Sequence, residues 1–120
     1  LYTAAGTTGI CTYQPMTKAD DETVELQVQR EFWQYGARPG MKIHFIMPTA
    51  INPSVTGVQK MGLIVIAGST DTRFIDQIVE HALRLKPQYI KMPVPFYMLL
   101  EAELGKKGKL PKDVLSYRTI

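Results

Sequence analysis

The sequence predicts an α/β fold, in which a parallel sheet built from βαβ units carries helices on both of its faces. Three observations support this class. Segments typical of strands alternate with segments typical of helices along the chain. Residues 63–67 form an unbroken apolar run, as expected for a parallel strand that is covered on both faces. Residues 75–83 carry apolar side chains at the spacing i, i+3, i+4, i+7 and i+8, which is the pattern of a helix packed on a sheet.

The composition is that of an ordinary globular domain. Hydrophobic residues make up 45% and charged residues 21% of the 120 residues, which favours neither a disordered nor a fibrous protein. No apolar run approaches the roughly 20 residues that cross a bilayer, and no signal peptide is recognisable, so we expect a cytoplasmic protein without a membrane span. The single cysteine, Cys11, excludes an internal disulfide and argues against structural zinc. The net charge is +3, and the basic residues are not gathered on one face of a recognisable nucleic-acid-binding module. We therefore expect no nucleic-acid partner.

Residues 16–35 are expected to form the first long helix. Thr17 is a suitable N-cap, and Asp20 can return a hydrogen bond in a capping box. Apolar side chains recur about every 3.6 residues along one stripe. Gly36 suits the left-handed position after the last turn. Trp33 lies off the stripe, so it either packs against a neighbouring element or forms a wall of a ligand pocket.

Three strands are expected before residue 68. One lies around residues 1–4, one at residues 42–47, and one in the apolar run at residues 63–67, with a short helix at residues 54–61 before it. His44 faces away from the apolar side chains of its strand. Since no acidic residue stands near it in the sequence, we expect a packed or surface histidine rather than a base.

The second half of the chain continues the alternation. The helix through residues 75–83 is expected to expose its carboxylates and His81 to solvent. A strand at residues 89–92 is followed by a helix from residue 95 to residue 104, which Gly105 ends. The lysines of residues 106–112 then form a basic loop, which either keeps the protein soluble or meets a CoA phosphate.

The most distinctive stretch is Thr-Ala-Ala-Gly-Thr-Thr-Gly at residues 3–9. Glycine frees the backbone to turn, and successive N–H groups can then form a concavity for phosphate oxygens, to which threonine hydroxyls add donors. This is not a Walker loop, because no Lys-Ser/Thr pair follows at the required spacing. A hairpin turn or a linker is the alternative interpretation. The candidate phosphate-binding residues are Thr3, Ala5, Gly6, Thr7, Thr8 and Gly9.

The order of segments after this loop resembles the adenylate-forming enzymes. Residues 10–20 read Ile-Cys-Thr-Tyr-Gln-Pro-Met-Thr-Lys-Ala-Asp, and residues 87–97 read Pro-Gln-Tyr-Ile-Lys-Met-Pro-Val-Pro-Phe-Tyr, which looks like the family's later strand-to-helix segment. Within the superfamily the chain is most similar to the phenylacetate-CoA ligase branch, whose loop has the form Ser-Gly-Thr-Thr-Gly before a Tyr-Thr-x-x-Asp helix start. Residues 1–120 would then be part of the large AMP-binding N-terminal domain, with the C-terminal domain absent. Four strands, with a further one beginning at residues 116–120, are too few for a complete sheet and agree with a fragment.

The chain departs from this pattern at two places. Members usually carry Lys and Pro after the last loop glycine, where this chain has Ile10 and Cys11, so one cation over the phosphates is missing. Members also tend to place aromatic residues and glycines after the second strand. Here residues 48–53 read Pro-Thr-Ala-Ile-Asn-Pro, which suggests a compact or aliphatic acid.

The resemblance implies an enzyme that activates a small carboxylic acid with ATP as acyl-AMP and then transfers the acyl group to CoA. Its cofactors would be ATP, Mg²⁺ and CoA, and we expect no catalytic or metal-binding residue in this segment. The acid pocket would include Thr49, Ala50, Ile51, Pro95, Phe96 and Tyr97. Core packing is the alternative for Phe96 and Tyr97, although they follow the carboxyl end of a strand, where α/β sheets bind ligands.

Two other functions stay open. An adenylating relative could hand the acyl group to an acceptor other than CoA. A non-catalytic module could bind phosphate ligands or a partner domain without turnover, which the absence of a lysine at Ile10 favours. Besides the acid, the expected partners are the rest of the parent enzyme and, as a further option, a second copy in a homodimer.

Overall fold

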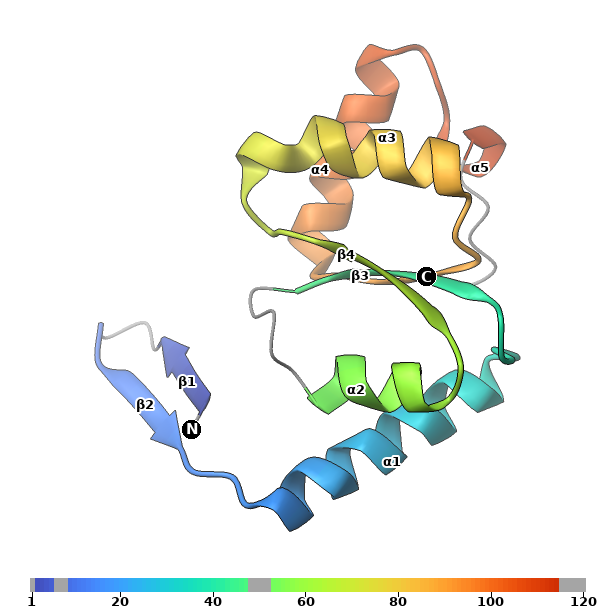
Figure 1. Cartoon of the computed structure of the whole chain (residues 1–120). Coiled ribbons are helices and arrows are strands. Elements are labelled where there is room, and N and C mark those ends of the chain that lie inside the picture. The colour runs from blue at the N-terminus through green and yellow to red at the C-terminus, as the bar shows by residue number, and fades with distance from the viewer. Residues whose placement is uncertain (1, 6–8, 48–52, 115–120) are drawn as a thin grey trace.

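The computed structural model describes residues 2–5, 9–47 and 53–114 (Figure 1). Strands and helices alternate along most of the chain, as the sequence predicts. The elements are β1 (Tyr2–Ala5), β2 (Cys11–Gln14), α1 (Lys18–Gln34), β3 (Lys42–Ile46), α2 (Pro53–Lys60), β4 (Ile64–Gly68), a 3-10 turn (Thr72–Phe74), α3 (Ile75–Leu85), β5 (Tyr89–Lys91), α4 (Val94–Lys106) and α5 (Pro111–Val114). The strand expected to begin at residues 116–120 lies outside the described residues.

A three-stranded parallel sheet, in the order β4-β3-β5, forms the centre of the molecule. Helices α1 and α2 cover one face of this sheet, and α3 and α4 cover the other (Figure 1). The alternation of β3 explains the two layers, because successive strand residues point to opposite faces. Ile43 and Phe45 face α1 and α2, whereas Ile46 faces α3 and α4. The predicted α/β class, with helices on both faces, is confirmed.

Each face of the sheet has its own apolar core. The side chains of the first core come from α1, α2 and the sheet: Val28, Phe32, Ala37, Ile43, Phe45, Val58, Leu63 and Tyr89. Those of the second come from α3, α4 and the sheet: Ile46, Ile78, Val79, Ile90, Phe96, Leu100 and Leu104. The periodicity of the α3 sequence therefore identified the buried face of that helix correctly.

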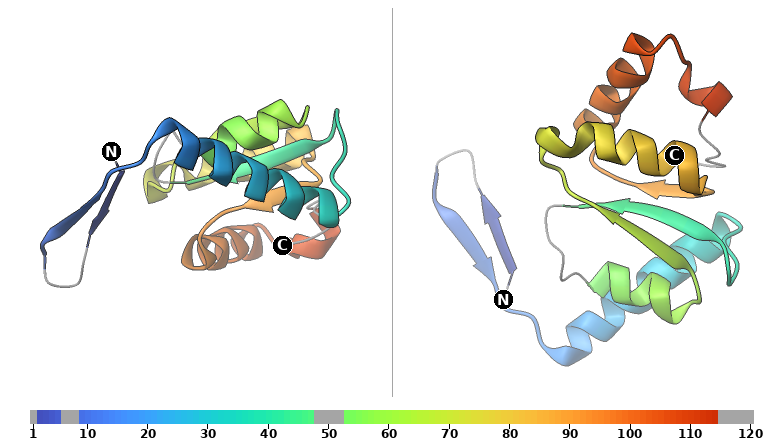
Figure 2. Two further views of the ribbon diagram at one scale, coloured as in Figure 1. Left: turned by 90° about the horizontal axis from the view of Figure 1, so that it is seen from below. Right: turned by 45° about the horizontal axis from the view of Figure 1, so that its top comes forward.

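The first strand does not join the parallel sheet, so the prediction of four parallel strands is wrong. β1 pairs antiparallel with β2 in a separate two-stranded sheet, where Ala5 lies opposite Cys11. The physical reason is that only residues 6–10 separate the two strands in the sequence, which is too few for the crossover that parallel neighbours need. Figures 1 and 2 show this hairpin standing apart from the parallel sheet, with the start of α1 as its link.

The apolar run of β4 is not covered on both faces, which corrects a second prediction. β4 is an edge strand of the described sheet, and Ile64 is 51% exposed. The central strand is β3, in which residues 43–46 are all buried. An apolar run shows that a segment prefers a sheet, but its place in the sheet depends on neighbours far away in the sequence.

The ends of the helices follow the predicted capping chemistry in one case and depart from it in another. Thr17 and Asp20 form a capping box at the start of α1, and Gly36 has a φ of +89° after its end, as predicted. Gly105 does not end α4, which continues to Lys106. The positive φ of +68° falls instead on Gly108, because the turn that needs it comes later.

Helices α1 and α2 pack closely at a single glycine. A Cβ on Gly57 would lie 2.9 Å from the backbone oxygen of Glu25. The carbonyl of Gly57 also accepts a hydrogen bond from Gln29 Nε2 at 3.2 Å, and Lys60 pairs with the Glu25 carboxylate. These contacts fix the middle and the end of α2 against α1. None of the helices that the structure describes combines the length and the apolar character needed to span a bilayer.

Candidate functional site

The topology of the sheet singles out the carboxyl ends of β3 and β5. These two strands are neighbours in the sheet, with His44 opposite Ile90. The chain leaves β3 toward α2 on one face and leaves β5 toward α4 on the other. Such a switch point opens a crevice outside the carboxyl ends, where open α/β sheets bind ligands. We therefore take this edge as the candidate site.

The hairpin of β1 and β2 lies on the same side of the molecule. In Figures 1 and 2 it stands beyond the end of the sheet toward which the carboxyl ends of the parallel strands point. Gly9 follows its loop with a φ of +74°, a conformation that suits glycine. The structure therefore brings β1 and β2, together with the carboxyl ends of the parallel strands, to one side of the fold.

The predicted phosphate-binding residues are only partly described. Thr3 and Ala5 belong to β1, opposite Tyr13 and Cys11 of β2. Gly9 follows the loop and is exposed. The other predicted residues, Gly6, Thr7 and Thr8, lie outside the described residues. The hairpin interpretation is correct for the backbone of β1 and β2, and phosphate binding by their connection stays a prediction.

The predicted acid-binding residues divide into three groups. Thr49, Ala50 and Ile51 lie outside the described residues. Phe96 is 5% exposed and packs in the second core, so core packing describes its role. Pro95 is exposed in the first turn of α4, and Tyr97 is half-buried beside it.

A cavity of about 340 Å³ lies between α1, β5 and α4. Its walls are largely apolar, and the side chains that line it are Glu31, Phe32, Tyr35, Tyr89, Ile90, Lys91, Met92, Val94 and Tyr97. Tyr97 is thus a predicted pocket residue that lines a cavity. Trp33, the other aromatic considered for a pocket, lies outside this cavity under the guanidinium of Arg38, 3.6 Å from its ring centroid. A second cavity of about 360 Å³ includes Trp33, for which a pocket wall was one of the two predictions.

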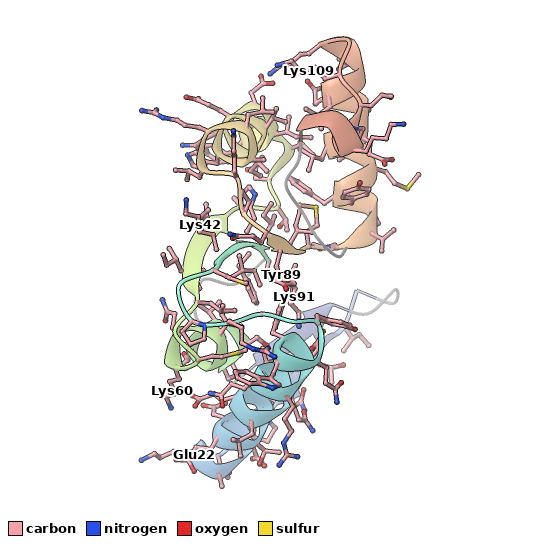
Figure 3. All side chains as sticks on the ribbon, turned by 90° about the vertical axis from the view of Figure 1, so that its right-hand side faces the viewer. Glu22, Lys42, Lys60, Tyr89, Lys91 and Lys109 are labelled. Carbon is pink, nitrogen blue, oxygen red and sulfur yellow. The ribbon has the colours of Figure 1, made fainter. Side chains whose placement is uncertain are left out.

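Polar groups at this cavity are few and paired. Lys91 Nζ lies 3.6 Å from the Glu31 carboxylate and 5.8 Å from the centroid of the Phe32 ring. The Tyr89 hydroxyl donates a hydrogen bond of 3.0 Å to the backbone oxygen of Tyr35. Both Tyr89 and Lys91 therefore reach from β5 toward α1, in the middle of the molecule (Figure 3).

Tyr97 adds a hydroxyl to the same cavity. Burial raises the pKa of Tyr97, and the charge of Glu101 and the hydrogen bond with it act in the same direction. A raised pKa keeps the phenol protonated at neutral pH. The cavity therefore offers one ammonium group, one carboxylate and tyrosine hydroxyls on largely apolar walls.

Sequence reasoning missed a pair of histidines on the other face of β3. His44 is fully buried, and its ring centroid lies 6.4 Å from that of His81 on α3. His81 is half-buried rather than at the surface, which corrects the prediction, and its Nδ1 has no hydrogen-bond partner among the described residues. Because side chains alternate along β3, His44 lies on the side of α3. No sequence pattern predicts its contact with His81, because the contact joins distant segments.

Burial, and then the charge of His81, lower the pKa of His44 from 6.5 to about 4. The imidazole is therefore neutral at physiological pH. The described residues hold no group of three or more His, Cys, Asp or Glu side chains that could bind a metal ion. The histidine pair thus acts as part of the core.

The comparisons with known proteins do not identify a family for this chain. A scan against protein-family models and a search among curated proteins found no match to the chain.

Proposed function

We propose that the chain is part of the N-terminal domain of an ATP-dependent carboxylate-CoA ligase. The observation that carries the proposal is the place of the hairpin. Strands β1 and β2, which flank in the sequence the loop that resembles the phosphate loop of adenylate-forming enzymes, lie on the same side as the switch point between β3 and β5. A nucleotide held by the loop could thus meet an acid held at the strand ends.

In the proposed reaction, the carboxylate of the acid attacks the α-phosphorus of ATP and expels pyrophosphate. The thiol of CoA then displaces AMP from the acyl adenylate. The first step needs donors arranged around the β- and γ-phosphates as the leaving group departs. The backbone N–H groups from Ala5 to Gly9 and the hydroxyls of Thr3, Thr7 and Thr8 would supply them. These groups bind and position the phosphates and do not act as bases.

The acid would lie at the carboxyl ends of β3 and β5. Thr49, Ala50 and Ile51 follow β3 in the sequence, while Pro95 and Tyr97 follow β5. Phe96 would support this corner from the core, where it is buried. Small side chains after β3 favour a compact or aliphatic acid.

The described residues do not fit a magnesium site of their own, because they offer no cluster of ligating side chains. Mg²⁺ prefers carboxylate oxygens together with substrate phosphates. In this proposal the ion therefore depends on the nucleotide and on parts of the enzyme outside these residues. No step of the proposal uses a metal ion held by this chain.

Pyrophosphate release tests the proposal in the enzyme that contains this chain. A panel of small carboxylic acids would be supplied with ATP, with and without CoA. We expect acid-dependent pyrophosphate release, and an acyl-CoA product only when CoA is present. Release without any acyl-CoA would favour an adenylating enzyme with another acceptor. No release with any acid would favour the non-catalytic module, in line with Ile10 where the family carries a lysine.

The loop has its own test in the same assay. The double variant Thr7→Val, Thr8→Val should lower the rate of adenylation about tenfold or more, because donors to the phosphates are lost. Thr12→Val is the matched control, since Thr12 is exposed on β2 outside the loop. Equal rates in both variants would remove the loop from the mechanism. The 120 residues alone should form no acyl-adenylate, because the expected catalytic residues lie elsewhere.

A further inference from the structure

We propose that the outer face of α1 binds the same face of a second copy of this chain, with the two helices antiparallel and a two-fold axis at Leu26. The inference concerns an interaction surface and does not depend on the proposed enzyme activity. It rests on the exposed side chains of α1, on their spacing along the helix and on the charges that this spacing brings together.

Helix α1 carries apolar side chains on two opposite faces. Val24, Val28 and Phe32 pack on the inner face, in the first core. Leu26 and Trp33 point the other way, because each residue turns an α-helix by about 100°, and they are 54% and 52% exposed. Figures 1 and 2 show α1 on the outside of the molecule, with α2 and the sheet on its inner side. A helix that covers a sheet normally has a polar outer face, so these apolar side chains indicate a partner.

Trp33 is held in place before any partner binds. The guanidinium of Arg38 lies over its ring, and Arg38 Nη1 donates hydrogen bonds to the backbone oxygens of Trp33, at 3.1 Å, and of Ala37, at 2.8 Å. An aromatic side chain that is already oriented loses little freedom on association. Tryptophan and arginine are also the residues that contribute most often to binding energy at protein interfaces. Trp33 is therefore suited to be the anchor of the surface.

A hollow beside Trp33 gives room for side chains of a second helix. This is the second cavity of about 360 Å³, and its lining residues are Gln29, Arg30, Trp33, Gln34 and Met61. All of them except Met61, which directly follows α2, belong to α1. The hollow therefore lies on the C-terminal half of α1 itself.

The spacing of the outer side chains fits a two-fold axis at Leu26. Ala19 precedes Leu26 by seven residues and Trp33 follows it by seven, so the three lie almost in line, because seven residues make nearly two turns. In an antiparallel pair, Ala19 of one copy then meets Trp33 of the other. A small side chain faces a large one, and the symmetry makes this contact twice.

The charges follow the same symmetry. Glu22 precedes Leu26 by four residues and Arg30 follows it by four, and both are exposed. The antiparallel pair therefore places Glu22 of each copy near Arg30 of the other. A parallel pair would instead bring like charges together, which is unfavourable. The charge pattern thus favours a second copy in the antiparallel orientation.

Both charged groups are available for this contact. Within the described residues, Arg30 forms no ion pair. The Glu22 carboxylate lies 4.0 Å from Lys18 Nζ, and both side chains are exposed. Such a surface pair contributes little, and a carboxylate has acceptor sites for a second cation.

Sedimentation velocity of the 120-residue chain tests the surface. The 17 residues of α1 span only about 25 Å, so the interface is small, and we expect a dissociation constant on the order of 10–100 μM. Trp33→Ala should raise this constant about tenfold or more. Met98→Ala is the matched control and should leave it unchanged, because Met98 is 64% exposed on α4. A chain that stays monomeric up to about 500 μM, or equal constants for the two variants, would overturn the proposal.

A charge exchange tests the antiparallel orientation. Glu22→Arg and Arg30→Glu should each weaken self-association about tenfold or more, because each variant places like charges opposite one another twice. An equimolar mixture of the two variants should recover the association of the unchanged chain, since every charged pair between the two different copies is then attractive. This recovery requires that both variants are folded, so it excludes misfolding as the cause of the weaker association. A mixture that associates no better than its components would contradict the contact between Glu22 and Arg30.

Discussion

His44 is a fully buried imidazole in the central strand, and its surroundings make the neutral form the stable one. Its pKa in the folded chain is about 4, against 6.5 for the ordinary side chain, chiefly because of burial. Between these two pH values the unfolded chain binds a proton that the folded chain excludes. The contribution of neutral His44 to the free energy of unfolding is therefore fully present above pH 6.5 and is lost as the pH decreases toward 4.

This linkage gives a prediction for acid unfolding. The free energy of unfolding should fall by about 2 kcal/mol between pH 7 and pH 5, as measured by urea titration. His44→Leu should remove most of this slope, whereas His81→Gln should keep most of it, since burial is the larger cause of the shift. A slope that survives in the leucine variant would show that another group is responsible.

Tyr89 shows how one buried hydroxyl fixes two segments. The side chain is 2% exposed, and its hydroxyl donates to the Tyr35 backbone oxygen just after α1. Tyr89→Phe keeps the ring but leaves this carbonyl without its donor, so we expect a loss of about 1 kcal/mol in the free energy of unfolding. Tyr13→Phe, at an exposed position, should change it far less. Equal effects in thermal or urea unfolding would show that the hydrogen bond to Tyr35 contributes nothing.

At the scale of the elements, the contact between α1 and α2 depends on the absence of a side chain. A methyl group on Gly57 would press on the backbone of Glu25, which cannot rotate away. We therefore expect Gly57→Ala to destabilise the fold by about 1–3 kcal/mol, despite the better helix propensity of alanine. The measurement is the urea midpoint of the purified chain.

Gly105 provides the matched control, because it also lies inside a helix but has nothing within 4 Å of the added Cβ. Gly105→Ala should leave stability unchanged or raise it by up to about 1 kcal/mol. If both variants shift the midpoint equally, helix propensity rather than the close approach of α1 and α2 decides the effect.

The sequence predicts local features of these elements better than their neighbours. Thr17 and Asp20 form their capping box because both partners lie within one turn. The pairing of β1 with β2, by contrast, was predicted only as an alternative, a hairpin turn, since Cys11–Gln14 carries no strong strand signal. The exposed Ile64 of β4 follows from the order of the strands, which periodicity does not contain.

At the scale of the whole molecule, alternation along the chain was enough to predict the α/β class and the helices on both faces. It was also enough to point to the carboxyl ends of the strands. The switch point was not predicted, because it requires that β5 return to the far side of β3. The contact of His44 with His81 was missed for the same reason, since it joins residues that are distant in the sequence.

The arrangement of the whole molecule supports the proposal that the hairpin and the end of the parallel sheet form one site. A two-stranded hairpin is only marginally stable by itself in water. The described hairpin stands beyond the end of the sheet, on the side of the switch point. Contacts with a ligand would therefore add to the stability of the hairpin.

Titration of the ¹⁵N-labelled chain with pyrophosphate or ATP, followed by nuclear magnetic resonance, tests phosphate binding most directly. We predict saturable shifts of the amide signals of Ala5, Gly6, Thr7, Thr8 and Gly9. The double variant Thr7→Val, Thr8→Val should weaken binding about tenfold or more, whereas Thr12→Val should not. Shifts confined to other segments, or binding that both variants retain equally, would contradict the account.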